Sequence, residues 1–394
     1  WTSETVSTVE ARSTGSEDTY EVLVNGSSID LAYVYVQVDG KWKNAAIHLD
    51  LEVSDVSEFL ADTGSDFGLA WFQGVVGEKP IMMQLTIAGA DVSGTYAYAH
   101  IGAPIEVNGV TGEDDSLALT EFAEGKRTGM FVGELDLAGG AWSGKWLNTD
   151  GSRELPFEVR RIALLIEEYR SSVWGEENLE ANIATPFFVE GGAGHSDALN
   201  AAIRNVVEEI WVGAVSDWTS SIAYYMREQP ESSLRLPHTL DISPAGIYHY
   251  SPALVSAALT VYTFTGGAHG MSWTLTQNLR LEDGKTAPLA LSALFREDSG
   301  YLQAISNHCI ASLKKEEASN VVNGNITEFA GEDLSSFVIS RAGLTVFFAP
   351  YAVGCYAEGS FEVTVPFEII SPLLRPDILD ALAAVPVSAE PAKG

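Results

Sequence analysis

Residues 262–270 read Tyr262-Thr-Phe-Thr-Gly-Gly-Ala-His-Gly270, and this stretch decides how the second half of the chain folds. A strand-like run from Leu259 to Phe264 stops at a pair of glycines, and a second run from Met271 to Leu279 leaves the turn. Glycine readily adopts backbone angles with positive φ, so the pattern predicts a tight antiparallel hairpin. His269 lies on the turn, where an imidazole either bonds neighbouring backbone or reaches a ligand.

The residues around this hairpin mix helix and strand patterns. Apolar residues at helical spacing predict an amphipathic helix from about Ser196 to Trp211. The 3-4-4 spacing of Leu302, Ile305, Cys309 and Leu313 predicts another helix. Residues 361–365 alternate apolar and polar side chains, as a half-buried strand does. We therefore predict a mixed α/β domain over residues 183–384 with a central antiparallel sheet.

The first half of the chain has a different pattern, with many short strand-like runs separated by turn signals. Such spacing predicts an antiparallel β meander that closes into a barrel or sandwich, here over residues 21–165. Trp142 and Trp146 are expected in the core of its late strands. The remaining ranges are predicted to be an extended N-terminal segment at 1–20, a linker at 166–182 and a tail at 385–394. The predicted fold class is therefore α+β.

The charge balance restricts the partners. Among 394 residues, 54 are acidic and 22 basic, which gives a formal net charge of −32. This field repels nucleic acid and anionic lipid and attracts cationic partners. A strongly acidic surface also favours solubility and is general in proteins from salty habitats. The charge therefore indicates either a specific cationic partner or one of these general roles.

Two cysteines, Cys309 and Cys355, are present. In an exported chain, one pair of cysteines predicts one disulfide, and buried free thiols are the alternative. An N-terminal signal peptide is absent or already removed, and no apolar run reaches the length of a membrane helix. We expect a periplasmic or extracellular protein, with loss of a membrane anchor left open.

Catalytic motifs are weak. Asp62-Thr-Gly-Ser65 matches the short signature of aspartic proteases, but that chemistry needs two carboxylates and no second copy occurs. Ser312-Leu-Lys-Lys315 has the Ser-x-x-Lys spacing of penicillin-binding enzymes without their other motifs. The seven histidines are scattered and form no local metal-binding pair. No catalytic residue, metal site or cofactor is predicted.

Several segments of the second half occur together in a recognisable order. They are 251–260, the Thr-Gly-Gly-Ala-His-Gly turn, Leu291-Ser-Ala-Leu-Phe295, Phe347-Phe-Ala-Pro-Tyr-Ala-Val-Gly-Cys-Tyr-Ala-Glu-Gly359 and Val363-Thr-Val-Pro-Phe367. The series resembles the extracytoplasmic domain of lysozyme-sensing anti-sigma factors, which is also fused to some peptidoglycan deacetylases. The resemblance covers roughly residues 183–376. It implies an α/β fold outside the cytoplasmic membrane and, in the sensor members, binding of the cationic protein lysozyme.

We therefore expect an exported, non-catalytic protein that binds a cationic protein such as lysozyme, or cell-wall glycan. One alternative is a subunit of a homopolymeric extracellular assembly, joined by strand addition through self-association of residues 1–20. Another is a cell-wall-acting hydrolase whose carboxylates come together only on folding. Aromatic side chains beside a glycine turn offer contact area at a small entropy cost. The predicted binding residues are Tyr262, Gly266, Gly267, His269, Tyr351 and Tyr356.

Overall fold

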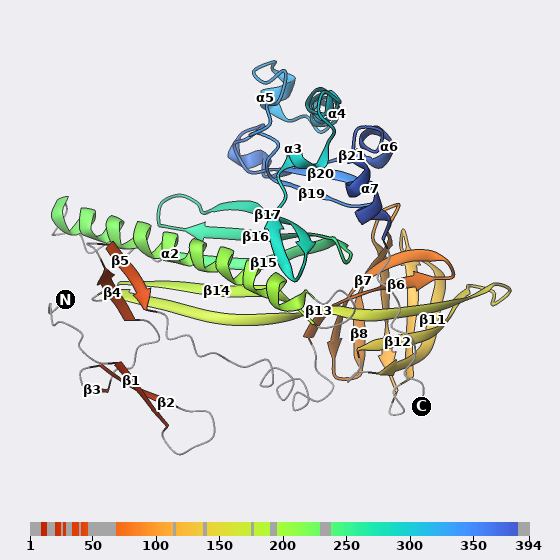
Figure 1. The fold of residues 1–394 in the computed structure, drawn as a ribbon, viewed down its shortest axis with the longest axis horizontal. Coiled ribbons are helices and arrows are strands. Elements are labelled where there is room, and N and C mark those ends of the chain that lie inside the picture. The colour runs from red at the N-terminus through yellow and green to blue at the C-terminus, as the bar shows by residue number, and fades with distance from the viewer. Residues whose placement is uncertain are drawn as a thin grey trace.

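The structure is a computed structural model of the chain, in which an all-β part precedes a mixed α/β part (Figure 1). It describes residues 68–112, 116–136, 140–174, 177–189, 195–228 and 238–384, and the backbone of five short strands before them. The predicted linker residues that are described lie within long β-strands, while the tail at 385–394 and the Asp62 motif lie outside the described residues. The five early strands are β1 (Val9–Ser13), β2 (Tyr20–Val24), β3 (Ser27–Ser28), β4 (Val34–Val38) and β5 (Lys41–Ala45).

The all-β part is an eight-stranded antiparallel barrel. Consecutive strands from the first to the seventh pair in a meander, and the last strand pairs with both the seventh and the first, which closes the ring. The prediction of an N-terminal barrel followed by a mixed domain is therefore confirmed. The barrel strands are β6 (Gly68–Val76), β7 (Lys79–Ala88), β8 (Asp91–Tyr98), β9 (Ile105–Thr111), β10 (Ser116–Ala123), β11 (Lys126–Asp136), β12 (Ala141–Asn148) and β13 (Glu154–Trp174).

Aromatic rings fill the barrel interior, as its narrow lumen requires. The indole of Trp142 is fully buried and packs against Phe157 and Phe131, with ring centroids 4.6 and 5.6 Å away. Trp146 is partly exposed, and its indole N–H donates to the Glu121 carboxylate at 2.7 Å. Glu121 is only 5% exposed and also accepts from the Tyr96 hydroxyl at 2.6 Å. Burial, and then this carboxylate, raise the pKa of Tyr96.

One strand, β13, belongs to both parts of the molecule. It pairs with β12 and β6 inside the barrel and continues past it as one arm of a ribbon with β14. An irregularity between Arg161 and Ala163 marks the exit, where a bulge re-aims the strand. Beyond it, the buried guanidinium of Arg170 donates to Glu168 at 2.6 Å and to Glu208 of the long helix.

The mixed part continues the same sheet. β14 pairs in parallel with β15, and the strands that follow are antiparallel. Helix α2 packs along β14 and β15 and buries a row of side chains from Leu199 to Ile222 against them (Figure 1). The elements are β14 (Glu177–Phe188), α2 (Ser196–Glu228), β15 (His238–Tyr250), β16 (Leu254–Phe264), β17 (Met271–Glu282) and β18 (Lys285–Pro288).

A three-stranded sheet with short helices packs on β16 and β17. Buried polar groups fix the contact: Ser256 Oγ donates to Asn278 at 2.6 Å and accepts from the Ile339 amide at 2.9 Å. Asn278 in turn donates to the Phe337 carbonyl at 2.7 Å. The elements are α3 (Leu291–Leu294), α4 (Tyr301–Lys315), α5 (Ser319–Val322), β19 (Phe337–Ile339), β20 (Gly343–Phe348), η1 (Tyr356–Glu358), β21 (Phe361–Pro366), α6 (Phe367–Ile370) and α7 (Pro376–Ala383).

The predicted disulfide is wrong. Cys309 is fully buried on the apolar face of α4, whereas Cys355 is exposed in the loop before η1, and both thiols are free. The same helical spacing that predicted α4 turns Cys309 into the core, where burial raises the pKa of its thiol to about 12. Cys309 is therefore a small apolar core residue, which was the alternative interpretation for a cysteine.

Candidate functional site

An aromatic cluster forms where the β16–β17 hairpin meets the loop between β20 and β21. The imidazole of His269 stacks on the Tyr356 ring, with centroids 3.7 Å apart and planes 18° from parallel. The Tyr351 hydroxyl lies 3.3 Å from Nε2 of His269, and its ring centroid is 5.5 Å from that of Tyr356. The fold thus brings together residues that are more than 80 positions apart in the sequence. We call His269, Tyr351 and Tyr356 the aromatic cluster.

Its hydrogen bonds define the histidine tautomer. Nδ1 of His269 lies 3.0 Å from the Gly270 carbonyl, which is an acceptor, so Nδ1 carries the proton. Nε2 is then an acceptor in the neutral ring, and the Tyr351 hydroxyl donates to it. The Tyr356 hydroxyl donates to the same Gly270 carbonyl at 2.8 Å. The three side chains are therefore held in fixed relative positions.

The geometry of the hairpin turn explains why glycines occupy positions 266, 267 and 270. Gly266 and Gly267 have φ of 85° and 96°, values that favour glycine. At Gly270 the reason is close approach, because a Cβ there would lie 2.4 Å from the end of the Tyr262 ring. Tyr262 thus packs against the backbone that carries the cluster and supports it. The structure places all six predicted site residues on or beside this hairpin and loop, while their role in binding stays a prediction.

Tyr351 is the exposed member of the cluster. Its side chain is 53% exposed, and its backbone has φ of 73°, which is uncommon for a bulky residue. Such a conformation persists only where the surroundings impose it, and it concentrates at ligand-binding and switch segments. The loop thus holds Tyr351 in an unfavourable backbone conformation, with its phenol exposed to solvent.

Glu358 orders the loop, and the sequence analysis did not single it out. Its carboxylate accepts from the Cys355 amide at 3.1 Å and from the Ser319 amide at 2.9 Å. The Cys-x-x-Glu spacing at 355–358 is that of a capping box, which was the available signal. Hydrogen bonds from Ser319, through side chain and amide, and then from Cys355 lower the pKa of Glu358 to about 2.

Acid is therefore expected to loosen this loop. A carboxylate with a lowered pKa stabilises the folded loop fully above about pH 4.5, and the contribution is lost as the pH falls towards about 2. Exchange of the Ser319 and Cys355 amide protons, corrected for intrinsic rates, should accelerate over that interval. Glu358→Gln should show the faster exchange already at neutral pH. Equal protection in the variant and the native chain would contradict the assignment.

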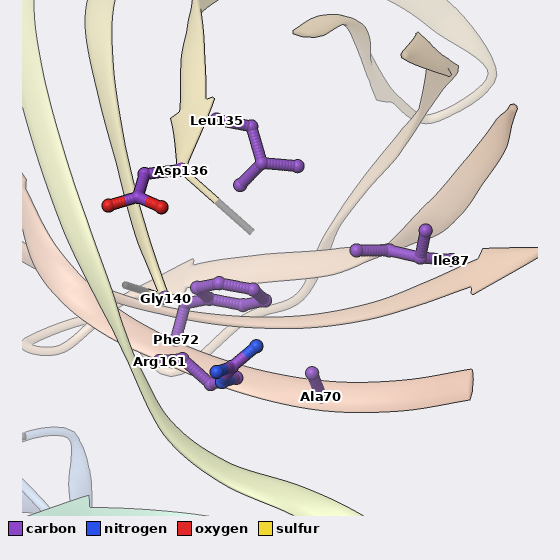
Figure 2. Close-up of a pocket in the computed structure, with 7 residues that line it drawn as sticks. All are labelled: Ala70, Phe72, Ile87, Leu135, Asp136, Gly140 and Arg161. Carbon is purple, nitrogen blue, oxygen red and sulfur yellow. The ribbon is translucent and has the colours of Figure 1, made fainter. Parts of the chain in front are cut away.

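The barrel wall has a small hollow of its own. Figure 2 shows the residues around a small hollow between the end of β11, the start of β12 and the middle of β13, with side chains of β6 and β7 beside it. Its lining is mostly apolar, with the Asp136 carboxylate and the Arg161 guanidinium at its edge. Burial lowers the pKa of Arg161, and Asp136 opposes that effect. No residue of the aromatic cluster contributes to this hollow.

Among the described residues, no three His, Cys, Asp or Glu side chains come close enough to hold a metal ion together. The helices that the structure describes include none with a stretch sufficiently long and apolar to span a bilayer.

Comparison with known proteins finds relatives of the second half. Residues 292–368 match a family model described as a protein of unknown function (DUF3298). The second half resembles that family. The matched segment contains Tyr351, Tyr356 and Glu358, whereas His269 precedes it.

A curated relative points the same way. The chain is 26% identical over 137 residues to the peptidoglycan-N-acetylmuramic acid deacetylase PdaC of Bacillus subtilis (strain 168). The match covers 34% of this chain and 29% of the relative, so less than a third of that enzyme is represented. The predicted resemblance to a domain found in peptidoglycan deacetylases is confirmed for the second half.

Two solved structures also match. A DUF3298 family member from Bacteroides fragilis is 18% identical, with a TM-score of 0.38, over 56% of this chain and 97% of its own. A DUF3298 family protein from Pseudomonas aeruginosa is 15% identical, with a TM-score of 0.38, over 55% and 96%.

Proposed function

We propose that the chain is an extracytoplasmic recognition protein that binds cell-wall glycan through the aromatic cluster. The observation that carries the proposal is the rigid, outward presentation of Tyr351 by His269 and Tyr356. An aromatic ring offers apolar contact area with few rotatable bonds, so little entropy is lost when a ligand packs on it. The hydroxyls and the imidazole beside it supply hydrogen bonds that orient a polar ligand.

The cell-wall assignment follows from the matched relative. The name of that enzyme indicates action on peptidoglycan, and the shared region lies in the half of this chain that carries the cluster. Work at the cell wall requires export, so we propose a location outside the cytoplasmic membrane. Recognition without bond-making is the function proposed for the cluster. Among the described residues, its hydrogen bonds join one imidazole, two phenols and the Gly270 carbonyl, and no carboxylate takes part in them.

The net charge favours a second candidate partner, a cationic protein such as lysozyme. A charge of −32 steers basic proteins to the surface and makes their binding sensitive to salt. Stacking of a neutral sugar on an aromatic ring depends far less on ionic strength. A salt titration of binding to purified peptidoglycan and to lysozyme therefore distinguishes the two candidates.

Tyr351→Ala is expected to weaken binding to purified peptidoglycan by about thirtyfold, because loss of an aromatic anchor typically costs about 2 kcal/mol. Tyr224→Ala is the matched control, since Tyr224 on α2 is also 53% exposed but lies outside the cluster. Sedimentation of each variant with insoluble peptidoglycan measures the change. Equal losses in both variants, or none in Tyr351→Ala, would exclude the cluster as the binding surface.

A further inference from the structure

Among the residues that the structure describes, one edge of β13 has no paired strand beyond the barrel. On its β6 side the pairing ends at Leu164 opposite Ala70, whereas on the other side it pairs with β14 as far as Trp174. Within the described ranges, no strand pairs with the β6-side edge of residues 165–174. This edge is as long as many complete strands.

The backbone hydrogen bonds between β13 and β14 indicate which residues present their backbone to this edge. Val189 N–H donates to the Ile162 carbonyl at 3.0 Å across the β13–β14 ladder. In an antiparallel ladder, hydrogen-bonded residues alternate, so the even-numbered residues from 162 onward direct their backbone groups towards β14. The odd-numbered residues 165–173 therefore direct theirs towards the open edge. Glu168 and Arg170 are even-numbered, and the Arg170 guanidinium forms ion pairs with the carboxylates of Glu168 and Glu208.

Three large apolar side chains on this segment are exposed. Tyr169 and Val173 are each 60% exposed and share one face of the strand, and Ile166 on the other face is 45% exposed. Residues 165–174 include no proline and no lysine, two residues with which proteins commonly protect strand edges. The segment is thus suited to strand addition.

We propose that this edge pairs with the same edge of a second copy of the chain, antiparallel, about a two-fold axis through Tyr169. This register places Tyr169 opposite its own copy and Leu165 opposite Val173, both apolar pairings. On the other face it sets Glu168 opposite Arg170, twice. Centring the axis on residue 168 would oppose two glutamates, and centring it on residue 170 would oppose two arginines, and like charges directly opposite are unfavourable.

The contact is isologous, so it closes at two subunits. It joins strands β13 to β18 of both copies into one continuous sheet, with β18 at each outer edge. This assembly differs from the homopolymer expected through residues 1–20, because it uses a described strand and ends at a dimer. It is also independent of the aromatic cluster, and loss of glycan binding would leave it unchanged.

Cysteine cross-linking tests the register. In a Cys355→Ser background, which removes the exposed thiol, Tyr169→Cys should form a covalent dimer under mild oxidation. Opposite residues of a hydrogen-bonded pair have Cα atoms about 5.5 Å apart, within the span of a disulfide. Val173→Cys alone should give at least tenfold less dimer, because its partner in this register is Leu165. A mixture of Leu165→Cys and Val173→Cys chains should restore cross-linking.

A second measurement does not depend on cysteines. The native chain should elute in size exclusion with light scattering at twice its mass of 42.3 kDa. Ser171→Pro removes an N–H that faces the open edge and spares the β14 ladder, so it should yield a folded monomer. A native chain that is monomeric, together with a Tyr169→Cys variant that forms no cross-link, would overturn the proposal. The same two results are expected if another part of the same chain covers the edge. Equal cross-linking of Tyr169→Cys and Val173→Cys would overturn the register.

Discussion

Trp142→Ala is expected to lower the free energy of unfolding by about 3–5 kcal/mol, which is the usual cost of truncating a large buried aromatic residue. The side chain is fully buried and contacts Phe131 and Phe157, which in turn contact each other at 5.2 Å between centroids. Its loss leaves a cavity that these rings cannot close, because the barrel wall fixes their positions. Urea denaturation followed by circular dichroism measures the change.

Trp142→Phe is the matched control. The indole N–H of Trp142 has no hydrogen-bond partner among the described residues, so replacement by a phenyl ring loses volume but no hydrogen bond. The expected cost is below about 1.5 kcal/mol, as for other substitutions that largely conserve volume. A cost in Trp142→Phe equal to that in Trp142→Ala would show that the N–H, and not the ring, carries the stabilisation.

Acidification is expected to weaken the packing of α7 against β15, because the buried His249 connects them. The side chain is 5% exposed, and its Nε2 lies 3.2 Å from the Ala381 carbonyl. Burial lowers the pKa of His249 to about 4, and the positive charge of Arg341 lowers it further. The hydrogen bond to the Ala381 carbonyl acts in the opposite direction and raises the pKa. The neutral ring is thus the form that the folded state accepts.

The sign follows from proton binding. The unfolded chain takes up a proton at His249 below about pH 6.5, whereas the folded chain does so only near pH 4. Stability from the neutral ring is fully present above about pH 6.5 and is lost as the pH falls to about 4, a change of about 3 kcal/mol. Thermal denaturation of the native chain and of His249→Gln across this interval measures it. The variant should lose the corresponding part of the pH dependence, and His100→Gln, at an exposed site, should retain it.

Much of the architecture was predictable because local patterns and tertiary packing agree. The alternating runs and turn signals of the first half predicted the barrel, and the glycine pair predicted the β16–β17 hairpin. The helix predicted from Ser196 to Trp211 continues to Glu228, since Val215, Trp218 and Ile222 extend its buried face. Periodicity identified the helix, but its end depends on how far the sheet beneath it extends.

Other features depend on long-range contacts that a sequence pattern does not contain. Residues 166–182 contain Ser, Gly and Glu and were predicted to be a linker, yet pairing between β13 and β14 makes most of them strand. The separation of Cys309 and Cys355 could likewise not be predicted from the sequence, because it depends on the fold, which turns one thiol to the core and the other to solvent. The aromatic cluster could be anticipated only as a set of residues, and its stacking required the coordinates.

The passage of β13 through both halves also limits how this polypeptide can be divided. An excised barrel would lose its closing strand or carry ten unsupported residues of it, and the excised second half would lose the arm that holds Arg170. The barrel is consequently not a domain that can be separated from the second half. Recombination that preserves the fold, in nature or in the laboratory, must therefore exchange both halves together.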